Sequence, residues 1–295
     1  MTTQVNEQTL EDQIYELIVR ASTDLPDDVV RALKAARRTE PEGTPAKNVF
    51  GMLLQNIDLA KKNMTPICQD TGTNLYYVHY PTGMSTRQLQ QVIERATVRA
   101  TENSILRPNA VDPVSGKNSG NNIGIQHPNI HFEEWKNDHL EFRLLLKGGG
   151  CENVSAQYKL PDSELDAGRD LNGVYKTVID AVEKAQGLGC APGIIGIGIG
   201  GDRATSHLTA KVQLFKKIED ENPDEELASM EKRLYRDLNS LGIGPMGFGG
   251  KTTVLGVKIG SAHRVPASYF VSIAYMCWAD RRHTLTVKNG EVIYD

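Results

Sequence analysis

The sequence predicts a mixed α/β protein, in which a helical N-terminal arm precedes a mixed sheet flanked by helices. Apolar residues recur at helical spacing through roughly the first sixty residues. Strand-like runs and helical segments follow one another after that point. The 27 glycines come in clusters, which mark places where the backbone approaches another group closely. We therefore expect one domain over residues 1–295, with a helical arm at 1–65 and an α/β body at 66–295.

The arm is expected to hold three helices, the first of which starts near Thr9. Its apolar residues have helical spacing: Leu10, Ile14, Leu17 and Ile18. A second helix follows Pro26, because proline in the first turn and acids near the positive end both favour a helix start there. A third is expected from about residue 47 to 62.

The body is expected to begin with a strand at 75–80, which is rich in aromatic and β-branched residues. A helix at 85–101 follows, and then a loop at 108–130 rich in Pro, Asn, Gly and Ser that could lie over a site. A second strand at 140–147 ends in three glycines.

The rest of the body is expected to mix helices and strands. In order, these are a helix at 173–184, a buried strand at 193–199, helices at 204–218 and 223–241, strands at 252–259 and 267–276, and a hairpin turning at Asn289-Gly290.

The charge balance argues against a nucleic-acid partner. Lys and Arg total 33 against 37 Asp and Glu, whereas nucleic-acid binders usually carry a basic excess on one face. An anionic small molecule is compatible with this balance, because a pocket needs only a few local cations.

The polar, acidic start of the chain does not resemble a secretory signal, and no apolar run approaches about 18 residues. We expect a cytoplasmic protein with no membrane partner.

Three of the four cysteines lie where thiolates could converge on a metal. Cys68, Cys190 and Cys277 are at turns or element ends, where side chains are not committed to core packing. Cys151 follows the three glycines. Four thiolate ligands would close a 4Fe–4S cluster and favour electron transfer, whereas three would leave one iron open as a Lewis acid. The spacing leaves both alternatives open, as well as buried structural thiols.

Other residues admit a functional and a plain structural interpretation. The stretch at 196–201 has the form GxGxxG with acids at 219–221, a weak dinucleotide signal because no N-terminal βαβ unit contains it. Arg107, before a proline, could bind a carboxylate or be a solvated surface charge. His263 ends a strand, and on sequence alone a satisfied polar residue is the simpler interpretation.

Five ordered segments together resemble a known enzyme family over nearly the whole chain. They are ICQDTGT at 67–73, LKGGGCEN at 146–153, GCAPGIIGIGIGGD at 189–202, LGIGPMGFGGKTT at 241–253 and MCWADRRHT at 276–284. They look like the α subunit of the two-subunit, class I iron–sulfur hydro-lyases, the fumarase and L-tartrate dehydratase family.

The resemblance implies a 4Fe–4S cluster held by Cys68, Cys190 and Cys277, with its fourth iron open to substrate. Cys151 falls where related proteins do not require a thiol, so it is not assigned as a ligand. The resemblance also implies a catalytic role for Asp70, as the group that passes a proton. It places further positions around the substrate: Gln69, Arg107, Gly149, Gly150 and His263.

The activity implied is the reversible hydration of fumarate to L-malate, a step of the tricarboxylic acid cycle. Thr73 and the form of residues 247–253 look more like fumarase than tartrate dehydratase. By the resemblance, the base that removes the carbon-bound proton lies on a separate β subunit, so we expect a heteromer. The alternatives are an L-tartrate dehydratase α subunit and a non-catalytic iron–sulfur redox or sensor protein with Cys151 as a fourth ligand.

Overall fold

The computed structural model describes residues 6–295. The chain forms two compact units: unit 1 comprises residues 6–26, 56–148 and 281–295, and unit 2 comprises residues 27–55 and 149–280. Residues 1–5 of the predicted arm lie outside the described part. Helix α3 (Pro45–Asn63) contributes residues to both units. The single domain predicted over residues 1–295 stays a prediction, and each unit is described below by itself.

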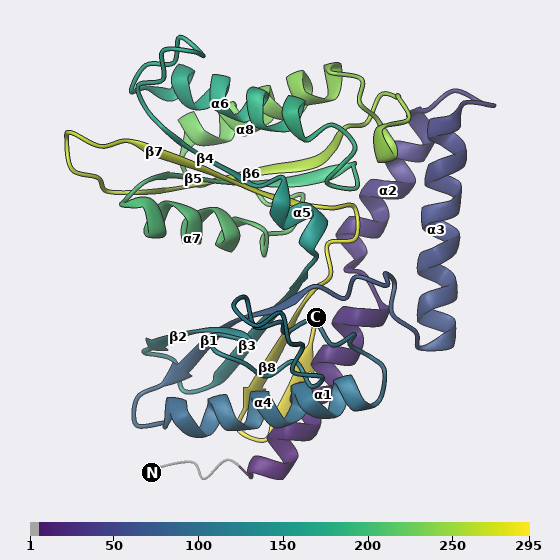
Figure 1. Ribbon diagram of the computed structural model, residues 1–295, viewed down its shortest axis with the longest axis vertical. Coiled ribbons are helices and arrows are strands. Elements are labelled where there is room, and N and C mark those ends of the chain that lie inside the picture. The colour runs from purple at the N-terminus through teal and green to yellow at the C-terminus, as the bar shows by residue number, and fades with distance from the viewer. Residues whose placement is uncertain (1–5) are drawn as a thin grey trace. The chain divides into compact units, whose positions relative to one another are not determined.

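Unit 1 is a five-stranded sheet covered by two helices (Figure 1). Its helices are α1 (Glu7–Thr23) and α4 (Thr86–Glu102), which contact each other. The strand order is β2-β1-β3-β8-β9, with β1 parallel to β2 and the other neighbours antiparallel. The strands are β1 (Thr73–Pro81), β2 (Asn129–Trp135), β3 (Leu140–Lys147), β8 (Arg282–Lys288) and β9 (Glu291–Tyr294).

The core of unit 1 lies between this sheet and the two helices. The apolar residues of α1 that have helical spacing are buried there, including Ile14 and Leu17, because they form one face of the helix. They pack in one cluster with Tyr76 and Phe142 from the sheet and with Ile93 from α4.

Unit 2 is a four-stranded sheet with helices on both faces (Figure 1). Its strand order is β4-β7-β5-β6, with β5 parallel to β6 and antiparallel to β7. The strands are β4 (Ala156–Lys159), β5 (Gly193–Gly200), β6 (Val254–Ala262) and β7 (Phe270–Met276). The helices are α2 (Asp27–Thr39), α5 (Gly149–Asn153), α6 (Leu171–Ala185), α7 (Arg203–Gln213), α8 (Glu225–Ser240) and the short 3-10 turn η1 (Pro245–Gly247).

Helix α7 packs closely on β5 because two strand residues lack a side chain. A β-carbon at Gly196 would lie 2.2 Å from the Ala210 carbonyl oxygen, and one at Gly198 would lie 2.0 Å from that of Ser206. The opposite face carries α6 and α8, as Figure 1 shows. The glycine repeat in β5 therefore serves the packing of a helix on a strand.

The mixed α/β class and the helical N-terminal part are confirmed. Most predicted elements are present, but β2 and β4 were missed, and the predicted loop at 108–130 ends where β2 begins. The helix predicted to reach residue 218 ends at Gln213, and the strand predicted from residue 267 starts at Phe270. Among residues 6–295, no helix combines the length and apolar character that crossing a membrane requires.

Candidate active site

Cys68 and Gln69 lie in the loop of unit 1 between α3 and β1. Ile67, the residue before Cys68, is fixed by hydrogen bonds to both its N–H and its carbonyl oxygen. The Ile67 N–H donates to the Ser22 carbonyl oxygen at 2.9 Å, and the Asn56 side-chain amide donates to the Ile67 carbonyl oxygen at 2.8 Å. Cys68 is half-buried and Gln69 exposed, so the loop holds both side chains outside the core.

Asp70 belongs to a tight turn that packs against the end of β3. Its Oδ1 accepts a hydrogen bond from the Gly72 N–H at 3.0 Å. Gly72 has a φ of +77°, and a β-carbon there would lie 2.6 Å from the Lys147 carbonyl oxygen, so only glycine fits. A β-carbon at Gly148 would lie 2.9 Å from Oδ2 of Asp70. The glycines thus allow the carboxylate to sit against backbone.

Arg107 is tied to this same loop through Thr71. The Arg107 N–H donates to the Thr71 hydroxyl at 3.0 Å, and the Asn109 side-chain amide donates to that hydroxyl at 3.2 Å. On the other side, the Asn122 amide donates to the Arg107 carbonyl oxygen at 2.9 Å. The Arg107 side chain is exposed. Unit 1 therefore brings Arg107 together with the segment that carries Gln69 and Asp70.

Sequence reasoning missed Thr71, Asn109 and Asn122, which position Arg107. Asn122 is 2% exposed and has a φ of +63°, a conformation that asparagine tolerates better than most residues. Its amide also donates to the buried Thr101 hydroxyl at 2.9 Å. The asparagines within the loop predicted at 108–130 were the available signal.

Cys190 and Cys277 lie at one edge of the unit 2 sheet. Cys190 precedes β5 and Cys277 follows β7, and Ile194 pairs with Met276 where those two strands run antiparallel. The Trp278 N–H donates to the Cys190 carbonyl oxygen at 3.2 Å. Cys190 is exposed and has a φ of +56°, which is rare for a residue with a side chain. Backbone strain of this kind is common at functional sites.

Cys151 is also in unit 2, but it is buried at 3% exposure. It lies on α5, after the exposed Gly149 and Gly150, and its Sγ is 3.9 Å from Sδ of Met276. Ser155 accepts a hydrogen bond from the Tyr275 N–H at 3.1 Å, which links the end of this segment to β7.

Tyr275 lies two residues before Cys277, and its ring is in contact with Gly189 and Gly193 on either side of Cys190 in the sequence. Burial raises its pKa, and electrostatic interaction with Cys277, Cys151 and Cys190 raises it further. Sequence reasoning did not identify this residue, although a tyrosine two positions before a candidate ligand was visible.

His263 lies at the opposite edge of the same sheet. It follows β6, which runs parallel to β5 with Gly193 opposite Val254 and Gly200 opposite Ala262. The 8 residues of β5 separate the two edges by about 26 Å, at roughly 3.3 Å a residue. In Figure 1 the loop between β6 and β7 lies at the end of the sheet away from α5. Unit 2 does not bring His263 together with Cys190 and Cys277, and its predicted substrate contact stays a prediction.

The GxGxxG stretch is not arranged as a dinucleotide site. Its first two glycines serve the packing of α7, and the N-terminus of α7, where a pyrophosphate would bind, is capped by Asp202. The Asp202 carboxylate accepts the Thr205 N–H at 2.7 Å, and this hydrogen bond lowers its pKa.

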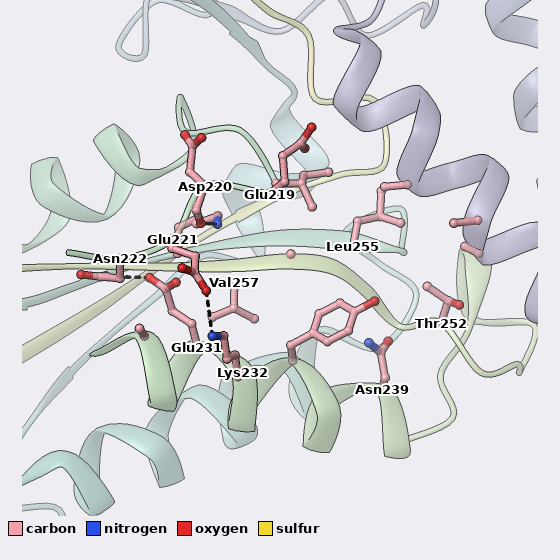
Figure 2. A pocket seen from close by; sticks show the side chains of 18 of the residues that line it. Glu219, Asp220, Glu221, Asn222, Glu231, Lys232, Asn239, Thr252, Leu255 and Val257 are labelled. Carbon is pink, nitrogen blue, oxygen red and sulfur yellow. Dashed lines mark hydrogen bonds and ion pairs between the residues drawn. The ribbon is translucent and has the colours of Figure 1, made fainter. Parts of the chain in front are cut away.

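The acids at 219–221 line a separate cavity of about 660 Å³ between α2, α8 and β6 (Figure 2). Glu221 pairs there with Lys232 at 2.9 Å, and Asn222 donates to Glu231 at 2.8 Å. No residue predicted for the active site lines this cavity. These acids therefore do not follow the arrangement in which a carboxylate contacts the ribose of a dinucleotide.

Within residues 6–295, no three His, Cys, Asp or Glu side chains form a ready-made metal site. Of the predicted ligands, Cys68 is in unit 1 and Cys190 and Cys277 are in unit 2. Cys190 and Cys277 occupy adjoining loops, as two ligands of the same metal centre must.

Known proteins resemble this chain along nearly its whole length. A provisionally named class I fumarate hydratase of Geobacillus stearothermophilus is 48% identical over 290 residues, 96% of this chain and 56% of that protein. A provisionally named L(+)-tartrate dehydratase subunit alpha of Methanocaldococcus jannaschii is 35% identical over 95% of this chain and 98% of its own length. The L(+)-tartrate dehydratase subunit alpha of Escherichia coli K12 is 31% identical over 97% of this chain and 95% of its own.

The chain thus spans about half of the first of these relatives and nearly all of the other two. All three carry the names of hydro-lyases or of their subunits. This chain belongs to the fumarate hydratase (Fumerase) family, whose model matches residues 11–286. The resemblance drawn from the sequence is confirmed.

Proposed function

We propose that this chain is the α subunit of an iron–sulfur fumarate hydratase, which interconverts fumarate and L-malate together with a β subunit. The observation that carries the proposal is the 48% identity to a class I fumarate hydratase over 96% of the chain. The tartrate dehydratase subunits are 31–35% identical over similar lengths.

Cys68, Cys190 and Cys277 would hold a 4Fe–4S cluster. Two observations of unit 2 fit such a group. Cys190 and Cys277 occupy loops that are joined by the hydrogen bond from the Trp278 N–H to the Cys190 carbonyl oxygen. The buried Tyr275 hydroxyl also lacks a partner among the described residues. Cys151 is the buried residue of α5, which suits a structural thiol better than a ligand.

When bound, a cluster with one iron open would supply a Lewis acid for the hydroxyl and one carboxylate of the substrate. Asp70 would hold or release the proton of that hydroxyl, and the Gly72 N–H fixes the orientation of its carboxyl group. Arg107 would bind the second carboxylate of the substrate through two N–H donors, which stabilises charge that develops there. Gln69 would donate a further hydrogen bond, and the exposed Gly149-Gly150 backbone leaves room for the ligand.

The partner in this proposal is a β subunit that supplies the base for the carbon-bound proton. The names of two relatives support it: the L(+)-tartrate dehydratase proteins of Methanocaldococcus jannaschii and Escherichia coli K12 are named as alpha subunits, a name that implies a partner subunit. The L-tartrate dehydratase α subunit is a second candidate function, favoured by the 31–35% identity to those same proteins.

The deciding experiment is anaerobic co-expression with a candidate β subunit, followed by iron and sulfide analysis and by assays with fumarate, L-malate and L-tartrate. We expect hydration of fumarate that exceeds any turnover of tartrate, and loss of both activity and iron in Cys68→Ser. Activity confined to tartrate would favour the second candidate. A full cluster without activity on either diacid would favour a redox or sensor protein.

A further inference from the structure

The Tyr275 hydroxyl is a buried polar group without a partner. Tyr275 is on β7, where it pairs with Ile195, and its side chain is 1% exposed. Among the described residues no donor or acceptor makes a hydrogen bond with this hydroxyl. A buried hydroxyl without a hydrogen bond is costly, so such groups are rare in folded proteins unless a ligand satisfies them.

The Tyr275 ring packs against the backbone at two glycines, which leave room for it because they lack a side chain. A β-carbon at Gly189 would lie 2.5 Å from Cε1 of Tyr275, and one at Gly193 would lie 2.6 Å from its hydroxyl oxygen. These glycines flank Cys190 in the sequence, so the hydroxyl lies against the backbone that presents this thiol. A side chain at either glycine would therefore displace the ring from this position.

The surroundings of the hydroxyl contain sulfur. Cys190 lies between the two glycines that the ring touches, and Cys277 is two residues farther along the chain. On the other side, Sγ of Cys151 contacts Sδ of Met276, the residue next to Tyr275. Thiolate and sulfide accept hydrogen bonds, and such bonds tune the reduction potential of iron–sulfur clusters.

We propose that the Tyr275 hydroxyl donates a hydrogen bond to sulfur of the bound iron–sulfur cluster, either at a ligating thiolate or at a neighbouring sulfide. The inference rests on the proposed function, because the acceptor arrives only with the cluster. Tyr275 is a positioning residue, since it acts on the metal centre and not on the substrate. The hydrogen bond withdraws electron density from sulfur, and it therefore raises the reduction potential of the cluster.

The test compares wild type and Tyr275→Phe as anaerobically prepared complexes with the β subunit. We expect the variant to have a lower midpoint potential in a redox titration followed by electron paramagnetic resonance. The oxidised-to-reduced ratio at a fixed potential should change at least threefold, which is about 28 mV for a one-electron couple. Iron–sulfur stretching bands in the resonance Raman spectrum should shift as well.

Tyr158→Phe is the matched control in the same unit. Its hydroxyl donates to Asp180 at 2.7 Å, so the variant also loses one tyrosine hydroxyl hydrogen bond. We expect its potential and Raman bands to equal those of wild type. An equal shift in both variants would overturn the proposal, because it would show a general response to a lost hydroxyl.

The melting temperature of the cluster-free chain gives an independent readout. There the variant should be as stable as wild type or more stable, whereas in the loaded protein it should hold the cluster less firmly. Without an acceptor, removal of the unpartnered hydroxyl should leave the melting temperature unchanged or raise it, whereas the loaded variant should lose its cluster to a chelator faster than wild type. A loaded Tyr275→Phe with wild-type potential, Raman bands and rate of cluster loss would sink the inference. Wild-type complex without iron and sulfide would instead sink the proposed function.

If Tyr275→Phe cannot be loaded, 3-fluorotyrosine at position 275 keeps the hydroxyl and strengthens it as a donor. We then expect the potential to move upward relative to wild type. An unchanged potential in that variant would contradict the proposal.

Discussion

The Trp278 N–H donates to the Cys190 carbonyl oxygen at 3.2 Å, and this bond joins the loop before β5 to the loop after β7. A second bond, from the Met246 N–H to the Ala191 carbonyl oxygen at 2.8 Å, adds the loop that contains η1. Both bonds use backbone atoms only. These two bonds therefore join the loops without using the sulfur atoms, although the Cys277 Sγ also donates to the Ala279 carbonyl oxygen at 3.7 Å.

Serine in place of Cys190 or Cys277 should accordingly remove the cluster and leave the fold intact. We expect iron and sulfide to fall to background and activity to fall at least about 100-fold, with an unchanged circular dichroism spectrum, because the hydroxyl of serine is a poor ligand for iron.

Cys151→Ser is the control for that pair of variants. Since Cys151 is buried beside Met276, serine should lower the free energy of unfolding by about 1–2 kcal/mol and leave the iron content unchanged. Loss of the cluster in Cys151→Ser would contradict the open site and support a cluster closed by four thiolates.

Alanine at Gly189 should disturb the same region by overpacking. The new β-carbon would lie 2.5 Å from the Tyr275 ring, a distance that real contacts do not reach, and the ring is buried at 1% exposure. We expect a loss of about 2–4 kcal/mol in the free energy of unfolding by urea. In Gly256→Ala the nearest contact is 3.6 Å, so a comparable loss there would show that the position of the ring is not the cause.

Local signals predicted much of the fold, whereas pairing between distant segments was beyond them. The first helix begins two residues before Thr9, because Asn6 accepts the N–H groups of Gln8 and Thr9. Strand β2 (Asn129–Trp135) was missed although polar and apolar residues alternate from Asn129 to Glu133, because the alternation is short and the parallel pairing with β1 forms only in the fold.

The sequence predicted those features of the candidate site that depend on residues close to one another in the chain. The segment that carries Cys190 is rich in turn residues, and Cys277 follows a predicted strand; the sheet brings the two to one edge. The same sheet sends His263 to the other edge, because a parallel partner of β5 must end where β5 ends. The glycines of β5 looked like a nucleotide signal, but their function is to admit α7, which only the packed structure reveals.

Asp180 should give unit 2 a stability that depends on pH. Its Oδ2 accepts hydrogen bonds from the Tyr158 hydroxyl and the Lys184 ammonium group, each at 2.7 Å. Burial by itself would raise the pKa of Asp180, but these partners lower it below the ordinary value of 3.8. A carboxyl group with a lowered pKa stabilises the fold above the pKa of the unfolded chain and loses this effect as pH falls through the folded value.

Asp180→Asn should therefore cost about 1–2 kcal/mol in free energy of unfolding at pH 7. The difference from wild type should narrow below about pH 4, where the Asp180 carboxyl group of the unfolded chain becomes protonated, and should narrow further as the pH falls through the lowered pKa of the folded protein. Urea titrations at pH 7, 5, 4 and 3 measure it, and Tyr158→Phe should show a smaller loss because the Lys184 bond remains. A difference that stays constant down to pH 3 would contradict this assignment.

Thr71 should control substrate binding through Arg107, although we place Arg107 and not Thr71 in contact with the substrate. The Thr71 side chain is 2% exposed, and its hydroxyl accepts from both the Arg107 N–H and the Asn109 amide. Valine has nearly the same shape but no acceptor, so Thr71→Val should release the segment that holds Arg107. We expect KM for the dicarboxylate to rise about tenfold, with a smaller change in kcat, because the guanidinium would bind from a less fixed position.

Thr71→Ser keeps the hydroxyl and should restore KM to within about twofold of wild type. A wild-type KM in Thr71→Val, measured beside an Arg107→Ala variant whose KM is raised, would show that Arg107 is positioned without this hydrogen bond.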